Sequence, residues 1–375
     1  MPLTVLYCVG SLSLGGTELN AVRTAAAFDP SRVRVVLATF RAEGPLLERY
    51  RALGIPIVDL GIQSLADSTM PRGVARLVRA LRRYRPSVVH SHDQFANALC
   101  VPAARIGSRA LVIASRRWGQ STPHRDRLNR FGSRYAHCVM ANSPAVSQFS
   151  IREGIPAERM RVIPNFVDDH AFIRSTPEQR VFWRRTNGIP EQAIVIGCVA
   201  RLDAVKEHAF LIAAFAQLAT ERGDVHLVLI GDGPLRESLE AQIRSSGLDG
   251  RISMLGERPN TENLHVGFDV SALVSSREGF PNSVVEAMAA GVPMIGTDVG
   301  GVPDAIRHGQ TGLVIPSGDL RALVDVLRSL CVDADLRTRL GSTAYRVAHE
   351  QYSKERVMSL WYQLYEGDPA EHALK

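Results

Sequence analysis

Residues 194–230 read IVIGCVARLDAVKEHAFLIAAFAQLATERGDVHLVLI and contain a complete β-α-β pattern. Apolar, β-branched runs at Ile194–Val199 and His226–Ile230 enclose Leu211–Ala219, where apolar residues recur at the three- and four-residue spacing of a helix. Both runs are apolar almost throughout, as in the strands of a parallel sheet that helices cover on both faces. This stretch therefore predicts a doubly wound α/β fold.

The same alternation extends in both directions along the chain. Further expected strands are Leu3–Val9, Val33–Thr39, Ile55–Leu60, Ser87–Ser91, Leu111–Ser115, Cys138–Ala141, Arg161–Ile163, Ile252–Leu255, Val270–Val274, Pro293–Gly296 and Leu313–Ile315. The alternation pauses over residues 165–190, which are polar, contain prolines and are expected to be a linker. We therefore expect two tandem domains, 1–168 and 169–353. Residues 354–375 are expected to form a C-terminal amphipathic helix that crosses back to the first domain.

Charge divides along the chain in the same way as the strand pattern. The 375 residues include 44 Lys+Arg and 38 Asp+Glu, a net charge of +6. Residues 1–175 hold 24 Arg and no Lys against 12 Asp+Glu, a net +12, and the remaining 20 Lys+Arg and 26 Asp+Glu give −6. Only Lys206, Lys354 and Lys375 are lysines. The asymmetry indicates domains with different partners, and the basic one suits an anionic partner.

The cysteines and the hydropathy pattern indicate in which cellular compartment the protein is expected. The five cysteines are scattered and never form a Cys-x-x-Cys pair, so we expect buried, reduced thiols rather than a disulfide or zinc framework. No run of about 18 apolar residues is present, so we expect no membrane span. The first residues, MPLTVLYCVG, lack the basic start of a signal peptide. These features predict a cytoplasmic protein, at most peripheral at the inner face of the plasma membrane.

Ligands of doubly wound sheets bind beyond the carboxyl ends of the strands, so the loops there are candidate sites. Gly15 and Gly16 end the first such loop and precede a helix, where backbone amides can approach a phosphate, although a tight turn without a ligand fits the glycines equally well. Arg201 and Lys206 follow Ile194–Val199. The forked guanidinium of Arg201 and the point charge of the Lys206 ammonium suit a diphosphate. The alternative is two solvated surface cations.

The richest candidate loop is residues 277–288, REGFPNSVVEAM. Glu278 precedes an expected helix start at Pro281–Ser283, and Glu286 lies on that helix. Two carboxylates beside a positively polarised helix end can hold sugar hydroxyls and a phosphate together. The alternative is that Glu278 only caps the helix. Asp298–Asp304 again places glycines before a helix, with a plain glycine turn as the simpler interpretation.

Taken together and in this order, the motifs resemble those of retaining glycosyltransferases of family 4, over nearly the whole chain. Glu278 and Glu286 form the Glu-x7-Glu element within EGFPNSVVEAMAAGVP, and Arg201 and Lys206 match the Arg-x4-Lys pair. Gly15-Gly16 match the family's glycine loop, and His90–His92 match its strand-end histidines. Ile163–Asp168 match its linker motif, with Phe166 in place of the usual Gly. The resemblance implies a GT-B fold, in which two Rossmann-like doubly wound domains face a central cleft.

The resemblance also implies roles for residues of this chain. A nucleotide-sugar donor, with UDP expected and GDP-mannose second, binds mostly to the second domain. Arg201 and Lys206 neutralise its diphosphate, Gly15 and Gly16 bring amides from the first domain, Glu278 holds sugar hydroxyls and Glu286 the ribose. The other implied substrate-binding residues are Arg258, Phe280, Asn282, Ser283 and Val284. The family is metal-independent, so we expect no metal and no cofactor beyond the nucleotide sugar.

One segment departs from the family pattern. Many relatives carry a His-Gly pair after the fifth strand, near the donor sugar, whereas residues 114–119 read ASRRWG and place Arg117 and Trp118 there. The departure puts histidine-assisted chemistry in doubt. His92 is the remaining catalytic candidate, as a donor- or acceptor-side residue, and a structural histidine is the alternative.

The acceptor is expected to bind the first domain. That domain contains the basic segment VARLVRALRRYRP at residues 74–86 and a second basic, aromatic-containing set: Arg116, Arg117, Trp118, His124, Arg125, Arg127, Arg130 and Arg134. Such segments are typical of contacts with anionic lipid, and an ordinary solvated helix is the alternative.

The expected function is transfer of a hexosyl or N-acetylhexosaminyl group to a glycan or lipid-linked acceptor, in polysaccharide or glycoconjugate biosynthesis. The alternatives are a sugar-nucleotide 2-epimerase of the same fold and a non-enzymatic protein that binds anionic surfaces. Nucleic acid is not an expected partner.

Overall fold

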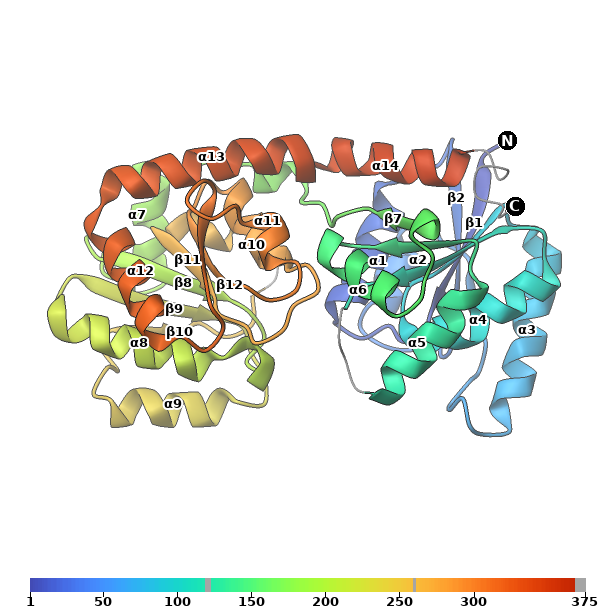
Figure 1. Cartoon of the computed structure of the whole chain (residues 1–375), viewed down its shortest axis with the longest axis horizontal. Coiled ribbons are helices and arrows are strands. Elements are labelled where there is room, and N and C mark those ends of the chain that lie inside the picture. Colours follow the sequence, from blue (N-terminus) through green and yellow to red (C-terminus); the bar gives the residue numbers. More distant parts are fainter. Residues whose placement is uncertain (119–122, 259–260, 368–375) are drawn as a thin grey trace. The chain divides into compact units, whose positions relative to one another are not determined.

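The computed structural model describes residues 1–118, 123–258 and 261–367 and divides into two compact units (Figure 1). Unit 1 comprises Met1–Asn165 and Val357–Lys375, and unit 2 comprises Phe166–Arg356. Each unit is built on one parallel sheet, as the opening β-α-β pattern predicts. The α/β class with two Rossmann-like sheets is therefore confirmed.

Unit 1 contains a seven-stranded sheet of order β3-β2-β1-β4-β5-β6-β7, with every pairing parallel. The strands are β1 Leu3–Val9, β2 Val33–Thr39, β3 Ile57–Asp59, β4 Val88–Ser91, β5 Leu111–Arg116, β6 Cys138–Ala141 and β7 Met160–Val162. The helices are α1 Gly16–Ala27, α2 Leu47–Ala52, α3 Thr69–Tyr84, α4 Gln94–Gly107, α5 Pro123–Tyr135, α6 Pro144–Arg152 and α14 Lys354–Glu366. Helices α3, α4 and α6 bury their apolar sides against one face.

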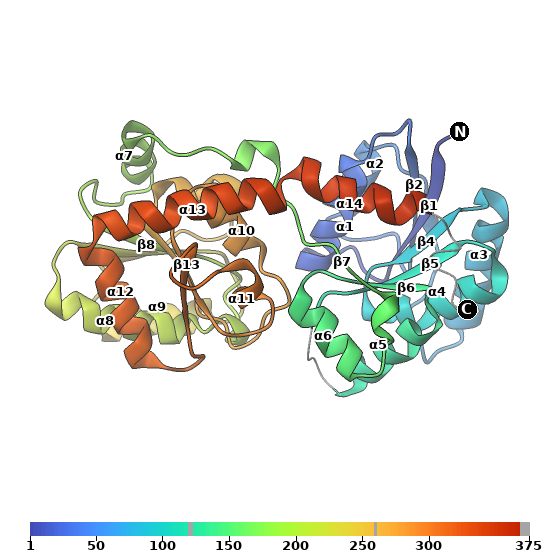
Figure 2. The same ribbon diagram turned by 45° about the horizontal axis from the view of Figure 1, so that its top comes forward.

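The C-terminal helix α14 packs on the other face of this sheet (Figures 1 and 2). The Tyr365 hydroxyl lies 2.6 Å from His90 Nδ1, and the Tyr362 hydroxyl accepts a hydrogen bond of 2.8 Å from the Asp29 backbone N–H. Glu366 pairs with Arg32 at 2.6 Å. The predicted helix within 354–375 is present through Glu366, and residues 368–375 lie outside the described residues.

Unit 2 contains a six-stranded parallel sheet of order β10-β9-β8-β11-β12-β13. The strands are β8 Ile194–Val199, β9 Val225–Ile230, β10 Ile252–Met254, β11 Val270–Leu273, β12 Met294–Thr297 and β13 Gly312–Ile315. The helices are α7 Pro177–Thr186, α8 His208–Glu221, α9 Arg236–Ser245, α10 Asn282–Ala289, α11 Val302–Ala305, α12 Leu320–Val332 and α13 Ala334–Tyr352. Helices α8, α9 and α12 cover one face, and α10, α11 and α13 pack into the apolar cluster of the other.

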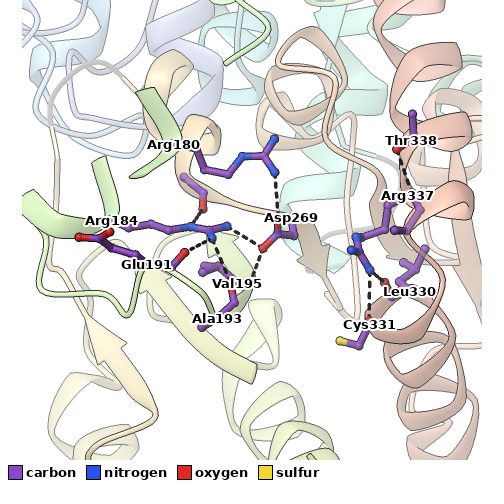
Figure 3. A network of polar contacts seen from close by, with 12 residues as sticks. Arg180, Arg184, Glu191, Ala193, Val195, Asp269, Leu330, Cys331, Arg337 and Thr338 are labelled. Atoms are coloured by element: carbon purple, nitrogen blue, oxygen red, sulfur yellow. Dashed lines mark hydrogen bonds and ion pairs between the residues drawn. The ribbon is translucent and has the colours of Figure 1, made fainter. Parts of the chain in front are cut away.

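The expected linker at 165–190 is not a free connection, because it contains α7. Thr176 and Gln179 form a capping box, and Pro177 occupies the first helical turn. Asp269, just before β11, ties the helix to the sheet (Figure 3): one carboxylate oxygen accepts from Arg180 at 2.9 Å, and the other accepts from Arg184 at 2.6 Å and from the Val195 backbone at 2.7 Å. The expectation of a linker over residues 165–190 is therefore wrong for the part that forms α7. The capping box that starts this helix is a pattern of polar residues, which hydropathy alone does not detect.

The basic helix α3 uses its apolar side within unit 1. Leu77 and Leu81 are buried in the sheet-facing core, whereas the arginines of α3 are exposed. In the second basic set, Arg116 and Arg117 are buried, which corrects the expectation that they form part of a surface patch, and the side chains of His124 and Arg125 lie outside the described residues. No helix in the described ranges is long and apolar enough to cross a membrane. Contact with an anionic membrane stays a prediction, and for α3 it rests on charge alone.

Candidate functional site

The loop after β8 is fixed by backbone hydrogen bonds to the loop after β9. The Leu202 N–H donates to the Asp232 carbonyl at 3.0 Å, and the Leu235 N–H donates to the Leu202 carbonyl at 3.0 Å. A Cβ atom at Gly231 or Gly233 would collide with the first loop, so both positions require glycine. Arg201 therefore lies at the carboxyl edge of the sheet with an exposed side chain.

Lys206 ends a 3-10 turn at Ala204–Lys206. Asp203 caps this turn by accepting a hydrogen bond of 3.1 Å from the Val205 N–H. The following residue, Glu207, has a φ of 53°, a left-handed conformation that is uncommon for a residue with a side chain. The sharp change of chain direction between the turn and α8 thus falls directly after the lysine.

Lys206 and Glu278, which are 72 positions apart, form an ion pair in which the carboxylate is buried and the lysine is partly exposed. The Lys206 Nζ atom lies 2.5 Å from Glu278 Oε1, and the Ser275 hydroxyl donates to the same oxygen at 2.6 Å. The Glu278 side chain is 4% exposed and the Lys206 side chain 19%. Two predicted site residues are therefore brought together, and one carboxylate oxygen of Glu278 accepts from both an ammonium and a hydroxyl.

Backbone contacts on two sides hold the Glu278 loop. The Ser276 N–H donates to the Val205 carbonyl at 2.8 Å, which joins this loop to the lysine turn. On the other side, the Gly301 N–H donates to the Gly279 carbonyl at 2.9 Å, and a Cβ atom at Gly300 would collide with the Glu278 carbonyl oxygen. The glycines after β12 therefore serve to bring backbone against the Glu278 loop.

Helix α10 begins immediately after this loop. Its N-cap is Pro281, which has no side-chain group to cap the helix, and Glu278 contacts Lys206 and Ser275 instead. Asn282 and Ser283 are half-buried in the first turn, while Val284 and Glu286 are buried. Phe280 packs on Tyr352 with ring centroids 5.5 Å apart. The interpretation of Glu278 as a mere cap is thus not supported by its side-chain contacts.

Arg258 stands apart from this group. Its side chain is exposed, and the next residues, Pro259 and Asn260, lie outside the described residues. The loop before it is tied to β9, because the Gly231 N–H donates to the Gly256 carbonyl at 2.9 Å. A cavity of about 520 Å³ in unit 2 is lined by none of the predicted site residues but by six others: Ile173, Glu178, Gln179, Phe182, Trp183 and Val266.

In unit 1, the predicted glycine loop precedes α1 as expected, but an acidic side chain lies against it. Gly15 is the N-cap residue of α1, and the Glu18 carboxylate folds back so far that a Cβ atom at Gly15 would collide with it. Burial raises the pKa of Glu18, while its own backbone N–H and the charge of Arg117 act in the opposite direction. Sequence reasoning missed Glu18, although an acidic residue in the first helical turn is a recognisable signal.

His92 lies in a buried aromatic cluster at the carboxyl end of β4. Its ring stacks on His90 at 4.1 Å and contacts Tyr7 at 4.2 Å between centroids. His90 is hydrogen-bonded through both nitrogens, to Tyr365 at 2.6 Å and Ser115 at 2.7 Å, whereas neither His92 nitrogen has a partner among the described residues. Burial holds the pKa of both histidines well below the usual value, so both rings are neutral near pH 7.

The described part of the segment that departs from the family pattern, residues 114–118, contains the end of β5 and the two residues after it. Arg117 is 6% exposed, and Trp118 is 44% exposed. Arg117 donates from Nη1 to Asn165 at 3.1 Å, while its Nε and Nη2 atoms are buried without a partner in the described structure. Burial lowers the pKa of Arg117 to about 10, which still leaves it protonated at neutral pH. The segment that departs from the family pattern thus contains a buried cation.

His208, the first residue of α8, lies beside the Lys206 turn. It is buried, and neither ring nitrogen has a hydrogen-bond partner in the described ranges. Burial lowers the pKa of His208 to about 4; Asp203 acts against this shift and Lys206 adds to it. The folded protein therefore holds this ring neutral, whereas the unfolded chain protonates it near pH 6.5.

His208 should make the protein less stable as the pH falls from about 6.5 towards 4, because in this range the unfolded state binds a proton that the native state does not. Between pH 7.5 and 5.0 we expect this group alone to remove about 2 kcal/mol. Urea unfolding of the wild type and of His208→Gln at both pH values measures the difference. An equal loss for the two proteins would contradict the prediction.

No cluster of three or more His, Cys, Asp or Glu side chains suited to a metal occurs among the described residues. Asp333 and Asp335 form an Asp-x-Asp sequence, a pattern that can bind a metal ion, but both are exposed. Asp333 instead caps α13 by accepting a hydrogen bond of 2.7 Å from the Leu336 N–H. The charges that meet at the candidate site are those of Lys206 and Glu278. Such a pair can bind hydroxyls through the carboxylate and phosphate oxygens through the ammonium.

Comparison with known proteins assigns both halves of the chain. Residues 14–171 match the family described as Glycosyltransferase Family 4, and residues 179–347 match Glycosyl transferases group 1. N-acetyl-alpha-D-glucosaminyl L-malate synthase of Bacillus anthracis is 26% identical over 97% of this chain and 95% of its own. A GDP-mannose-dependent alpha-(1-6)-phosphatidylinositol monomannoside mannosyltransferase of Mycobacterium tuberculosis is 26% identical over 73% of this chain and 74% of its own.

Among solved structures, HepE of Anabaena in complex with UDP superposes with a TM-score of 0.87 at 23% identity, covering 98% of this chain and 100% of HepE. At this level of identity the likeness concerns the fold, which is GT-B. The family matches and the fold agree with the Glu278, Glu286, Arg201 and Lys206 motifs. The chain therefore belongs to glycosyltransferase family 4 and is a GT-B glycosyltransferase that uses a nucleotide-sugar donor.

Proposed function

We propose that the chain transfers a hexosyl or N-acetylhexosaminyl group from a UDP-sugar, with retention of configuration, to a glycan or lipid-linked acceptor. The observation that carries this proposal is the ion pair of Lys206 and Glu278 at the carboxyl edge of the unit 2 sheet. The family assignment favours a transferase over the 2-epimerase and the non-enzymatic alternatives. Unit 2 is the proposed donor side, and unit 1 the proposed acceptor side.

In this proposal Lys206 stabilises the departing diphosphate. An ammonium has three N–H donors, and Glu278 engages one of them, so two remain for phosphate oxygens. Arg201 is exposed at the same sheet edge and adds a second positive charge. Fixed charges aimed at the place where negative charge develops lower the barrier without reorganisation during the reaction. The Glu278 carboxylate, held by Ser275, accepts hydrogen bonds from donor-sugar hydroxyls.

UDP is proposed over GDP because the HepE structures contain UDP and UDP-glucose. The name of the Bacillus anthracis relative also indicates an N-acetylglucosaminyl group as the sugar. The mannosyltransferase relative is named as GDP-mannose-dependent, so GDP-mannose is the second candidate. Calorimetric titration with UDP, GDP, UDP-glucose, UDP-N-acetylglucosamine and GDP-mannose tests the choice. Binding of a guanosine donor alone would overturn the UDP assignment.

Lys206→Ala should weaken UDP binding about 10- to 100-fold, because a hydrogen bond to a charged group contributes about 1.5–3 kcal/mol. Lys354→Ala is the matched control, since Lys354 is half-buried at the start of α14 and is not a predicted site residue. Calorimetric titration of both variants with UDP gives the two dissociation constants. An unchanged affinity in Lys206→Ala would remove the diphosphate role of this residue.

A further inference from the structure

Two consecutive arginines at the end of β5 have opposite surroundings. Side chains alternate along a strand, so Arg116 lies on the side of Val112 and Ala114, and Arg117 on the side of Ser115. Arg116 is completely buried, and its Nε and Nη1 atoms also lack a partner in the described structure, but its Nη2 pairs with the Glu153 carboxylate and its guanidinium lies 5.8 Å from the Phe149 ring centroid. Arg116 therefore has an internal counter-ion and is explained by the fold.

Arg117 has no such counter-ion. The only side-chain hydrogen bond of Arg117 in the described structure joins Nη1 to the neutral amide of Asn165, and Nε and Nη2 are buried without a partner. No carboxylate of the described residues forms an ion pair with it. A buried, protonated guanidinium without a counter-ion is unfavourable for the folded protein, so its presence calls for an anion from outside the chain.

The side chains around Arg117 supply hydrogen-bonding groups, and the Glu18 carboxylate lies within electrostatic reach without forming an ion pair. His92 is buried beside it with both nitrogens unpartnered, and the Tyr50 hydroxyl and Asn142 Oδ1 are buried without partners as well. His92 and His90 are neutral, because burial and the charge of Arg117 both lower their pKa. Several unsatisfied polar atoms therefore surround one cation at the carboxyl end of the sheet, where parallel α/β sheets bind ligands.

Two acidic groups lie near this cluster: Asp93, whose carboxylate accepts from the Gly10, Phe95 and Ala96 backbone N–H groups, and Glu18 in the first turn of α1. The Glu18 carboxylate lies against Gly15, close enough to Arg117 for the two charges to interact but not as an ion pair. Gly16 has open space where a side chain would be. A guanidinium that is more than nine-tenths buried, with two unpartnered nitrogens, thus lies in the same region of unit 1 as the first turn of α1.

We propose that Arg117 and His92 bind an oxyanion, a carboxylate or phosphate group carried by the acceptor, and that the Glu18 carboxylate occupies part of this site until the acceptor arrives. This inference rests on the proposed function, in which unit 1 binds the acceptor. The guanidinium fork matches two oxygens of a carboxylate or phosphate. A neutral acceptor leaves the buried charge unmatched, so the site selects anionic acceptors over neutral ones.

The first experiment needs no turnover and uses malonate and inorganic phosphate as probes. At constant ionic strength, millimolar malonate or phosphate should raise the thermal midpoint of the wild type by about 2–4 °C, because ligands that bind the native state stabilise it. Arg117→Gln should show no such rise, and its midpoint without anion should equal or exceed that of the wild type, because an unmatched buried charge is removed. Arg79→Gln, which removes an exposed charge from α3, is the matched control and should respond as the wild type.

Two further variants keep the test decisive if Arg117→Gln does not fold. Arg117→Lys keeps the charge but loses the fork and should bind malonate at least several-fold more weakly than the wild type. Glu18→Gln removes the competing carboxylate and should bind malonate several-fold more tightly. Equal responses to malonate in the wild type, Arg117→Lys and Glu18→Gln would overturn the proposal, as would a wild type that malonate and phosphate do not stabilise.

A last comparison separates the acceptor from the donor as the source of the anion. If the acceptor carries it, the stabilisation by malonate adds to that by saturating UDP-glucose. If a donor carboxylate occupies the site, UDP-glucuronate displaces malonate and loses its advantage over UDP-glucose in Arg117→Gln, which would overturn the assignment to the acceptor. UDP binding through Lys206 is measured independently, so a failure of the proposed donor site is distinguishable from a failure at Arg117.

Discussion

Glu278→Gln is expected to lower kcat by about 10²- to 10³-fold, the range found when one electrostatic stabiliser of a transition state is removed. Glutamine keeps the shape of the side chain and can still accept a hydrogen bond from Ser275. It removes the negative charge that fixes Lys206 at 2.5 Å, so the ammonium is no longer held in place for a diphosphate. Initial rates with the preferred UDP-sugar measure the effect.

The stability of Glu278→Gln separates catalysis from folding. Lys206 is partly exposed and can turn towards water when its partner is lost, so the free energy of unfolding should fall by only about 1–3 kcal/mol. Glu350→Gln is the matched control, because it breaks the exposed pair with Arg346 at the i, i+4 spacing on α13, and we expect a loss of about 0.3–0.5 kcal/mol with unchanged kcat. A kcat within twofold of the wild type in Glu278→Gln would contradict the proposed role.

Gly300→Ala should disable the donor site without changing any charged group. The φ of Gly300 is 52°, and a Cβ atom there would collide with the Glu278 carbonyl oxygen, so the Glu278 loop must move. The left-handed conformation and the overpacking together should cost about 2–5 kcal/mol. A displacement of about 1 Å at a reacting group can reduce turnover 10²-fold, and we expect a loss of that order in kcat/KM.

Gly309→Ala separates backbone strain from close approach. The φ of Gly309 is 74°, but a Cβ atom there meets no atom within 4 Å. This variant should therefore lose only the left-handed preference of glycine, about 1–2 kcal/mol, and keep its kcat/KM. If both variants lose turnover equally, the contact between the two loops is not what matters for activity.

Hydropathy periodicity predicts the strands well, because each strand of a parallel sheet is buried on both faces and is apolar along its length. Strands β1, β2, β6 and β8 have the predicted bounds, and the other strands differ by one or two residues. Helix α7 was missed because it contains few apolar residues, only Val181, Phe182 and Trp183: it is fixed by a capping box and by Asp269, which is about 90 positions away in the chain. Contacts at such sequence separation leave no local pattern.

The same limit applies to the candidate site. The Glu278 and Lys206 motifs are recognisable in the sequence, but their pairing depends on the adjacency of β8 and β11 in the sheet, which places loops 72 residues apart side by side. Nothing in the sequence distinguishes Arg116 from Arg117. Their surroundings differ because successive side chains point to opposite faces of the strand and because Glu153 lies on the Arg116 side. Glu18 lies in the first turn of α1, as its position predicts, but its return to Gly15 depends on the folded loop.

Helix α14 gives the order of synthesis a structural consequence. The sheet of unit 1 is encoded before residue 165, yet Tyr365, which bonds His90, and Glu366, which pairs with Arg32, are translated after the whole of unit 2. Because domains begin to fold as the ribosome releases them, the first unit waits for its last helix while the second is made. A nascent chain stalled before residue 357 would hold unit 1 with the Tyr7 and His90 face of its sheet uncovered.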